Sequence, residues 1–271
     1  MPGYARLGAN ALDFQEFMIA PVGAATEAEA VRTGAEVYHV LAGLVRDRFD
    51  TAGLGDEGGF APQLEGPRMV LDLLVEAITA AGYTPGVDQV AIALDPAANG
   101  FHLGGGRYRV NGLEIGRDQL VDYYLDLIGA YPIRSLEDGF AEDDPEGWAA
   151  MAQAVAGRVQ LVGDDLYVTD PARIRDGAEH GYSDTVLIKP NQIGIVTQTF
   201  EAILTARELG MTCMVSHRSG ETADTFISDL VAGTGVGQIK SGAPARGERV
   251  AKYNRLTEIE HDHPDLPYGL A

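Results

Sequence analysis

Short apolar runs alternate along the chain with longer segments in which apolar residues recur every three or four positions. Short runs bounded by turn residues are typical of buried strands, and the longer period is typical of amphipathic helices. The clearest helix is predicted over Thr26–Phe49, with Thr26 as its N-cap and Val37 and Leu41 on one apolar face. The predicted strands cover Phe14–Val22, Val90–Leu94, Ile133–Leu136, Val159–Val162, Val186–Ile188, Thr212–Val215 and Gly237–Ile239.

Helices are expected between these strands, and a surface hairpin is expected around Asn111-Gly112. Strands that alternate with helices of ten or more residues indicate βαβ units and a parallel sheet. A closed eight-stranded barrel of this kind takes about 250 residues. The pattern therefore predicts an α/β fold, an eight-stranded TIM-like (β/α) barrel. We place it over residues 10–260, with 1–9 as an N-terminal remnant and 261–271 as a loose C-terminal tail. The further helices are predicted over Met69–Ala81, Gln119–Ile128, Pro145–Val155, Pro171–His180, Thr197–Leu209, Glu221–Ala232 and Arg246–Ile259.

Composition narrows the class of protein. The chain has 271 residues, 45% of them hydrophobic, and a net charge of −20. So acidic a chain repels nucleic acid and anionic membranes, and we expect neither as a partner. Cys213 is the only cysteine, which excludes an internal disulfide. No apolar run is long enough to span a membrane and the N-terminus does not resemble a signal peptide, so we expect a soluble cytoplasmic protein.

Charged residues follow the predicted strands where each apolar run ends, and in a (β/α) barrel the active site lies at these ends. Three carboxylates in one barrel mouth would repel one another without a cation. Carboxylates without a histidine or cysteine set favour a hard divalent ion, Mg²⁺ before Zn²⁺. Two lysines and an arginine there suggest an anionic substrate. The strand-end residues are Asp95, Glu137, Asp164, Lys189, His217, Arg218, Ser219 and Lys240, and a glycine-rich turn adds Glu57.

Lys189 is the central residue of this hypothesis. It ends the run Val186–Ile188, and Pro190 stops the strand directly after it. Burial at a strand end lowers the pKa of a lysine and makes it a usable base. The alternative is a lysine that reaches to water from the strand end. His261 and His263 in the tail are interpreted as part of a frayed terminus rather than a metal site.

The charged residues named above lie in seven segments of the chain, which are LGDEGGFAP, ALDPAA, SLEDGF, QLVGDDLYVTDP, LIKPNQIG, VSHRSGET and GQIKSGAPARGERVAKYNRL. These segments resemble successive motifs of the enolase family, the phosphopyruvate hydratases of glycolysis, within a similarity that runs from about Asn10 to Glu260. The resemblance implies a lyase that dehydrates 2-phosphoglycerate reversibly to phosphoenolpyruvate through a Mg²⁺-stabilised ene-diolate.

The resemblance also implies a role for each matching residue. Lys189 matches the base that removes the carbon-2 proton. Glu57 matches the acid that helps hydroxide leave carbon 3, and Glu16 its supporting carboxylate. Asp95, Glu137 and Asp164 match the Mg²⁺ ligands. Gln15, His217, Arg218, Ser219 and Lys240 match contacts to a small phosphorylated carboxylate substrate. A homodimer is one arrangement that the resemblance leaves open.

Some positions depart from the family pattern. Leu7 stands where enolases have a histidine, and Pro190 replaces a small apolar residue. No carboxylate precedes Phe101, and nothing matches the N-terminal lid domain that closes over the substrate. Because lid closure excludes water and completes such sites, we expect impaired turnover without it. Two alternatives stay open: a diverged enolase-like enzyme of secondary metabolism, similar to carboxyphosphonoenolpyruvate synthase, and a non-catalytic barrel that binds a metal, ligand or protein.

Overall fold

The computed structural model describes residues 3–5, 12–49 and 53–270. Leu7 and most of the predicted N-terminal remnant lie outside these residues. The chain divides into two compact units. Strands β3 (Val90–Asp95) and β10 (Thr212–Ser216) each belong partly to one unit and partly to the other. Unit 1 comprises Met1–Leu12, Glu16–Ile92 and Val215–Ala271, and unit 2 comprises Asp13–Gln15 and Ala93–Met214.

Unit 1 combines strands with the longest helices. In it β1 pairs antiparallel with β2, Gly3 opposite Met18, and β10 pairs parallel with β11, Ser216 opposite Lys240. Helix α1 packs against α2 and α9, and α8 packs against α9. The predicted cap is confirmed, because the Thr26 hydroxyl accepts the backbone N–H of Glu29 at 3.1 Å. The elements are β1 (Gly3–Ala5), β2 (Glu16–Pro21), α1 (Glu27–Arg48), α2 (Pro67–Ala80), α8 (Phe226–Thr234), β11 (Ile239–Lys240) and α9 (Gly247–Asp262).

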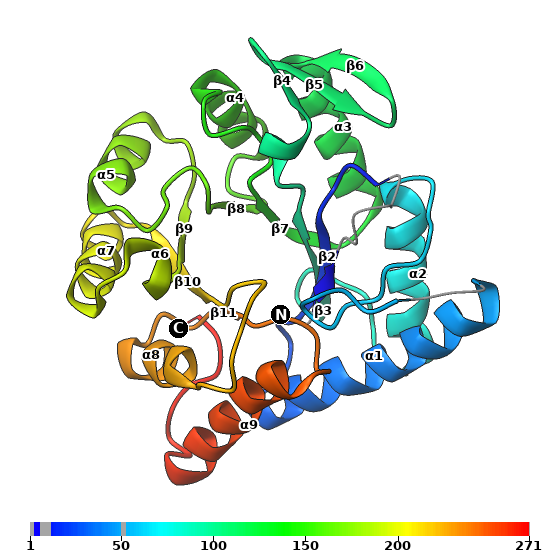
Figure 1. The fold of residues 1–271 in the computed structure, drawn as a ribbon, viewed down its shortest axis with the longest axis vertical. Helices are drawn as coiled ribbons and strands as arrows, with labels where there is room; N and C mark the ends of the chain where they lie inside the picture. The colour runs from blue at the N-terminus through cyan, green and yellow to red at the C-terminus, as the bar shows by residue number, and fades with distance from the viewer. Residues whose placement is uncertain (1–2, 6–11, 50–52, 271) are drawn as a thin grey trace. The chain divides into compact units, whose positions relative to one another are not determined.

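Unit 2 contains the parallel strands β7, β8 and β9, with Glu137 opposite Val162 and Val162 opposite Thr185. Helix α7 packs on β9 and against α5, and α3 packs against α4 (Figure 1). The elements are a 3-10 turn (Ala98–Gly100), β4 (His102–Gly104), β5 (Arg107–Val110), β6 (Leu113–Gly116), α3 (Arg117–Ala130), β7 (Ile133–Glu137), α4 (Pro145–Val155), β8 (Gln160–Gly163), α5 (Pro171–His180), β9 (Thr185–Ile188), α6 (Pro190–Ile193) and α7 (Val196–Glu208).

The predicted hairpin is present as part of a small antiparallel sheet of β4, β5 and β6. Asn111 and Gly112 join β5 to β6 with φ angles of 51° and 76°. Positive φ at both residues is what a two-residue hairpin turn of type I′ requires, and Asn-Gly meets it at low cost. This sheet lies apart from the strands that carry the charged residues.

The strands of the main sheet are hydrogen-bonded in the order β1-β2-β3-β7-β8-β9-β10-β11. The alternation of strands and helices is therefore confirmed, with shifts at the ends of elements. Glu137 is the last residue of β7 and Lys240 the last of β11, whereas both were expected just beyond the strands. Within the described residues no ladder joins β11 to β1, so closure into an eight-stranded barrel stays a prediction.

One helix prediction needs correction, and one strand end is followed by a helix that was not predicted. The helix expected over Glu221–Ala232 begins only at Phe226, because the Glu221 carboxylate accepts the N–H groups of Arg218 and Thr222, each at 3.1 Å. This residue therefore organises a loop. Pro190 ends strand β9 as expected, but it also begins the short helix α6, where its missing N–H costs nothing. None of the helices in the described part of the chain combines the length and apolar character needed to cross a lipid bilayer.

Asp144 holds together the part of unit 2 around α3, α4 and the small sheet. Its carboxylate caps α4 by accepting the backbone N–H of Gly147, and it also accepts the Tyr108 hydroxyl at 2.6 Å. The guanidinium of Arg117 donates to the same carboxylate at 2.6 and 2.9 Å. Burial would raise the pKa of Asp144, but these hydrogen bonds and the Arg117 charge lower it below its usual value. The buried carboxylate thus joins three elements as an anion.

We expect Asp144→Ala to lower the free energy of unfolding by about 3–5 kcal/mol, because it removes a helix cap and leaves buried partners unpaired. Urea denaturation at pH 7 measures this loss. The matched control is Asp122→Ala, at an exposed position of α3, which should change stability by less than about 0.5 kcal/mol. The pKa of Asp144 is lower in the folded chain than the unfolded value of about 3.9, so its ionised carboxylate stabilises the fold above pH 3.9 and this contribution is lost as the pH falls below it. The difference in unfolding free energy between wild type and Asp144→Ala should therefore narrow as the pH falls through about 4. A gap that widens on acidification would contradict this account.

Candidate active site

The three predicted metal ligands all lie in unit 2, at the carboxyl ends of its strands. Asp95 ends β3, Glu137 ends β7 and Asp164 directly follows β8. All three side chains are buried, between 2% and 8% exposed. Because β7 and β8 run parallel, with Glu137 opposite Val162, their carboxyl ends share one edge. The three acids therefore lie at the carboxyl ends of their strands, and their role as metal ligands stays a prediction.

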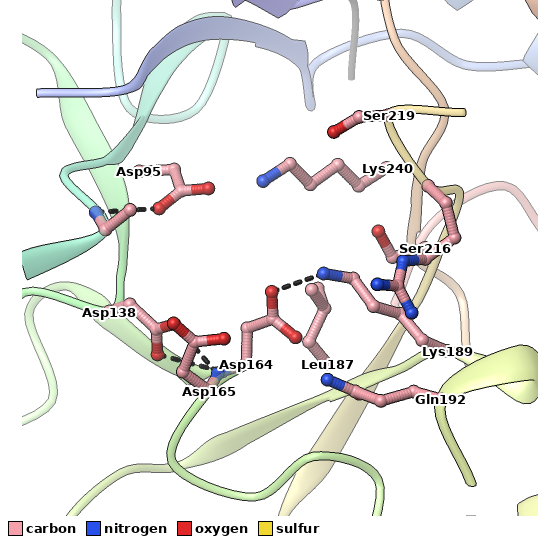
Figure 2. Close-up of polar contacts among 12 residues, drawn as sticks. Asp95, Asp138, Asp164, Asp165, Leu187, Lys189, Gln192, Ser216, Ser219 and Lys240 are labelled. Carbon is pink, nitrogen blue, oxygen red and sulfur yellow. Dashed lines mark hydrogen bonds and ion pairs between the residues drawn. The ribbon is translucent and has the colours of Figure 1, made fainter. Parts of the chain in front are cut away.

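The tightest acidic group differs from the predicted set. Asp138, Asp164 and Asp165 place one carboxylate oxygen each within 4.8 Å of one another. Asp138 and Asp165 were not predicted, although each is the second acid of a Glu-Asp or Asp-Asp pair. The Asp138 carboxylate accepts the backbone N–H groups of Asp164 at 2.9 Å and Asp165 at 2.8 Å (Figure 2). Both of its oxygens thus hold the loop after β8 in place.

Negative charge is concentrated in this cluster. Burial first, and then the charges of Asp164 and Asp95, raise the pKa of Asp138 well above its usual range. Burial and the charge of Asp164 likewise raise the pKa of Asp165, against a hydrogen bond from Asn99. The Oδ1 atom of Asp164 is buried and accepts no hydrogen bond from the described residues. An unsatisfied buried carboxylate oxygen among further carboxylates fits a hard divalent cation.

Lys189 is the cation nearest to this cluster in unit 2. Its ammonium nitrogen forms an ion pair with Asp164 Oδ2, and Figure 2 shows the side chain pointing at that carboxylate. Its backbone N–H donates to the Thr169 hydroxyl at 2.9 Å, which fixes the residue directly after β9. The lysine side chain is 15% exposed, so it lies largely within the protein and does not extend to water. The interpretation as a site lysine fits this position.

In unit 1, Glu57 is held in its glycine-rich turn. Gly55 donates to Gly59 O at 2.8 Å, and Ala243 donates to Glu57 O at 2.9 Å. At Gly58, φ is +81° and an added Cβ would meet the Ala245 carbonyl oxygen at 2.9 Å. Only glycine fits this position without strain. The glycines expected to make a tight turn therefore aim the Glu57 carboxylate.

Glu57 contacts two other predicted site residues. Its Oε2 lies 3.2 Å from His217 Nε2, and its Oε1 accepts the Ser219 hydroxyl at 3.1 Å. Burial alone would raise the pKa of Glu57, but the close approach of His217 and the charges of Lys240 and Arg249 lower it to about 2. Burial also lowers the pKa of His217, against the Glu57 carboxylate. At pH 7 Glu57 is thus an anion facing a neutral imidazole.

The remaining predicted residues are also placed. Lys240 Nζ lies 3.5 Å from Glu16 Oε2, and both side chains are buried in unit 1. The backbone N–H of Gln15 donates to Asp95 O at 3.1 Å in unit 2, and Gln15 itself is exposed. Arg218 is half-buried and follows His217 in the loop after β10. Sequence reasoning missed Arg249 and Lys252, two cations of α9 that are almost fully buried. Their burial is what distinguishes them from ordinary surface cations, and the spacing of residues along the predicted helix did not reveal it.

Glu57→Gln should lower the free energy of unfolding at pH 7 by up to about 3 kcal/mol, the value of a pKa shift from about 4.3 in the unfolded chain to about 2 in the folded one. Because the pKa of Glu57 is lower in the folded chain than in the unfolded chain, its carboxylate contributes fully to stability above the unfolded pKa. This contribution is lost as the pH falls through the folded pKa. The difference should therefore shrink below pH 4.3. Urea denaturation from pH 7 to pH 3 tests this, with exposed Glu65→Gln as the matched control. An undiminished difference at pH 3 would refute the assignment.

Comparison with known proteins identifies the chain's relatives. Residues 5–266 match the family model of the enolase C-terminal TIM barrel domain. An enolase of Mycobacterium leprae (strain TN) is 51% identical over 256 residues, which are 94% of this chain and 59% of the relative. An enolase of Rubrobacter xylanophilus is 54% identical over 254 residues, 93% of this chain and 59% of the relative. The chain thus spans about three fifths of the length of these curated relatives. It belongs to the enolase family, whose C-terminal TIM barrel domain it matches.

Proposed function

We propose that the chain catalyses the enolase reaction, the reversible dehydration of 2-phosphoglycerate to phosphoenolpyruvate. The observation that carries this proposal is the placement of Lys189 against Asp164 in a chain about half identical to enolases. The proposal includes the finer fold prediction, a closed eight-stranded (β/α) barrel over residues 10–260. No contact among the described residues favours a diverged enzyme or a non-catalytic barrel over this reaction.

Lys189 and Glu57 have the two proton-transfer roles in this proposal. The Lys189 amine removes the proton from carbon 2, and hydroxide leaves carbon 3 with a proton from Glu57, so that water and a carbon–carbon double bond form. Glu57 is an anion in the ligand-free protein. We therefore expect the bound anionic substrate to raise the pKa of Glu57, because a like charge nearby favours the protonated acid. Glu16, which pairs with Lys240, supports this carboxylate.

We propose Asp95, Glu137 and Asp164 as the residues that would hold Mg²⁺. The orphaned Asp164 oxygen and the buried carboxylate edge of unit 2 support this choice. Asp138 is unsuited to be a ligand because both of its oxygens already accept backbone N–H groups. When bound, the cation would act as a Lewis acid that stabilises negative charge on the substrate carboxylate.

The substrate contacts of the proposal carry positive charge or hydrogen-bond donors. Arg218 offers a planar fork of donors that matches a phosphate, and Lys240 offers a point charge. Ser219, His217 and Gln15 add neutral polar groups. A set of this chemistry suits a small phosphorylated carboxylate.

Lys189→Ala should abolish exchange of the substrate's carbon-2 proton with solvent deuterium and leave Mg²⁺ binding almost intact. Glu57→Gln should retain part of this exchange and lose elimination, because Glu57 acts on the leaving group. NMR in D₂O follows the exchange, and absorbance of the enol product follows elimination. If the wild-type chain binds 2-phosphoglycerate with Mg²⁺ but exchanges no faster than Lys189→Ala, the lyase proposal fails.

Two ligand sets can be distinguished by experiment: the proposed set, which contains Glu137, and the observed group of Asp138, Asp164 and Asp165. Glu137→Gln should abolish Mg²⁺ binding in isothermal titration calorimetry, because an amide oxygen lacks the ligand's charge. Asp165→Asn, in that group but outside the proposed ligand set, is the matched control and should keep binding within about tenfold. The reverse result, with binding lost in Asp165→Asn and kept in Glu137→Gln, would move the site to the three aspartates.

A further inference from the structure

Arg249 lies in the first turn of α9 and has no exposed surface. A buried guanidinium is costly unless its donors are matched by acceptors. Here the acceptors lie on two loops of unit 1. Nη1 donates to Arg218 O at 2.7 Å, and Nη2 donates to Ser219 O at 2.6 Å and Asp56 O at 3.1 Å. One side chain thus joins the loop that carries Glu57 to the loop that carries His217 and Ser219.

The fourth contact of Arg249 reaches an imidazole. Nη1 lies 2.6 Å from Nδ1 of His217, which is itself buried. A guanidinium has only donors and keeps its charge at all ordinary pH values. The Nδ1 atom must therefore accept, so it carries no proton. A neutral imidazole with a bare Nδ1 carries its proton on Nε2, the atom 3.2 Å from Glu57 Oε2.

This arrangement opposes the imidazolium form. A second proton on Nδ1 would point at the Arg249 donor, with no acceptor between them. The charged groups that act on His217 are Glu57, which favours the imidazolium, and Arg249 and Lys240, which oppose it. Burial acts in the same direction as the two cations. The geometry and the charges thus agree on a neutral ring.

We propose that Arg249 is a positioning residue, which fixes His217 as the neutral Nε2–H tautomer and so places the ring's proton on the atom that faces Glu57. Ser219 donates to Oε1 of Glu57, and Nε2 of His217 lies 3.2 Å from Oε2, close to it but without a hydrogen bond in this structure. His217 then orients Glu57 and does not supply it with a proton. The consequence for catalysis rests on the proposed function, but the tautomer does not.

Lys252 provides a matched comparison on the same helix. It is 1% exposed, and its ammonium donates to Glu221 Oε2 at 2.9 Å, Thr222 O at 2.7 Å and Glu248 O at 2.9 Å. It therefore supports the same loop after β10 without touching His217. Loss of Lys252 should destabilise this loop, whereas loss of Arg249 should also change the imidazole.

The direct test is a long-range ¹H–¹⁵N correlation spectrum of the whole chain with ¹⁵N-labelled histidine, from pH 5 to pH 8. The chain has six histidines, and His217→Gln assigns the signal. We expect the Nε2–H pattern throughout this range. An Nδ1–H pattern, or a ring that is protonated at pH 6, would overturn the proposal without any Arg249 variant.

The variants separate positioning from general loss of structure. Arg249→Ala should lose the pure Nε2–H pattern and give mixed tautomers, and added guanidinium ion should restore it. Lys252→Met should lower the melting temperature and keep the Nε2–H pattern. If Lys252→Met shifts the tautomer as much as Arg249→Ala, or if Arg249→Ala keeps the wild-type pattern, Arg249 has no specific role. If Arg249→Ala does not fold, Arg249→Gln takes its place, because its amide can accept as well as donate and therefore no longer forces Nδ1 to accept.

Activity gives a second, separate readout. On the proposed function, Arg249→Lys should slow elimination of hydroxide more than exchange of the carbon-2 proton, because Glu57 acts only in elimination. An equal loss of both rates would contradict the positioning role. If the wild-type chain shows neither rate, the proposed function fails, while the spectrum of His217 still decides the tautomer.

Discussion

Asp138 and Asp164 lie out of water at the ends of neighbouring strands, and much of unit 2 around them compensates their charge. Asp138 accepts the N–H groups of the next loop, and Lys189 pairs with one oxygen of Asp164. A buried carboxylate costs several kcal/mol unless charges and donors surround it. The positions of the β8 loop and of the residue after β9 therefore depend on one another, and both depend on keeping these acids inside.

Unit 1 meets the same constraint with a different chemistry. Its buried acid, Glu57, is stabilised as an anion by the Ser219 hydroxyl, which donates to it, and by nearby His217, Lys240 and Arg249. Its buried cations, Arg249 and Lys252, direct most of their donors to backbone carbonyls. Charges matched in this way restrict the loops to one geometry, because any shift leaves a buried group unpaired. The loops that carry Glu57 and Ser219 are thus held by the buried side chains of Arg249 and Lys252.

The two units differ in the direction in which they shift the pKa values of their acids. Burial and charge repulsion raise the pKa of Asp138 and Asp165 in unit 2, whereas nearby polar groups and cations lower the pKa of Glu57 in unit 1. Environments that push the pKa values of acids apart give them different tasks. An excess of negative charge suits the binding of a cation. In the proposed reaction, Glu57 becomes a proton donor only when the bound substrate raises its lowered pKa. This contrast supports the division of roles in the proposed reaction.

The sequence by itself determined which segments form strands and helices, and that charged residues follow the strands. Apolar runs ending at Asp95, Glu137 and Lys189 predict this because burial of the run leaves the next residue at the sheet edge. Only the tertiary structure decided which contacts each acid makes in the pairs Glu137-Asp138 and Asp164-Asp165. Neighbouring residues at a strand end point in opposite directions, so a shift of one residue exchanges the roles of Glu137 and Asp138. Arg249 and Lys252 resemble ordinary helix-surface cations in the sequence. Apart from Glu248, which lies four residues before Lys252, their partners lie about 30 residues away or, for Asp56, nearly 200. Contacts between residues so distant along the chain arise from packing, which local pattern does not encode.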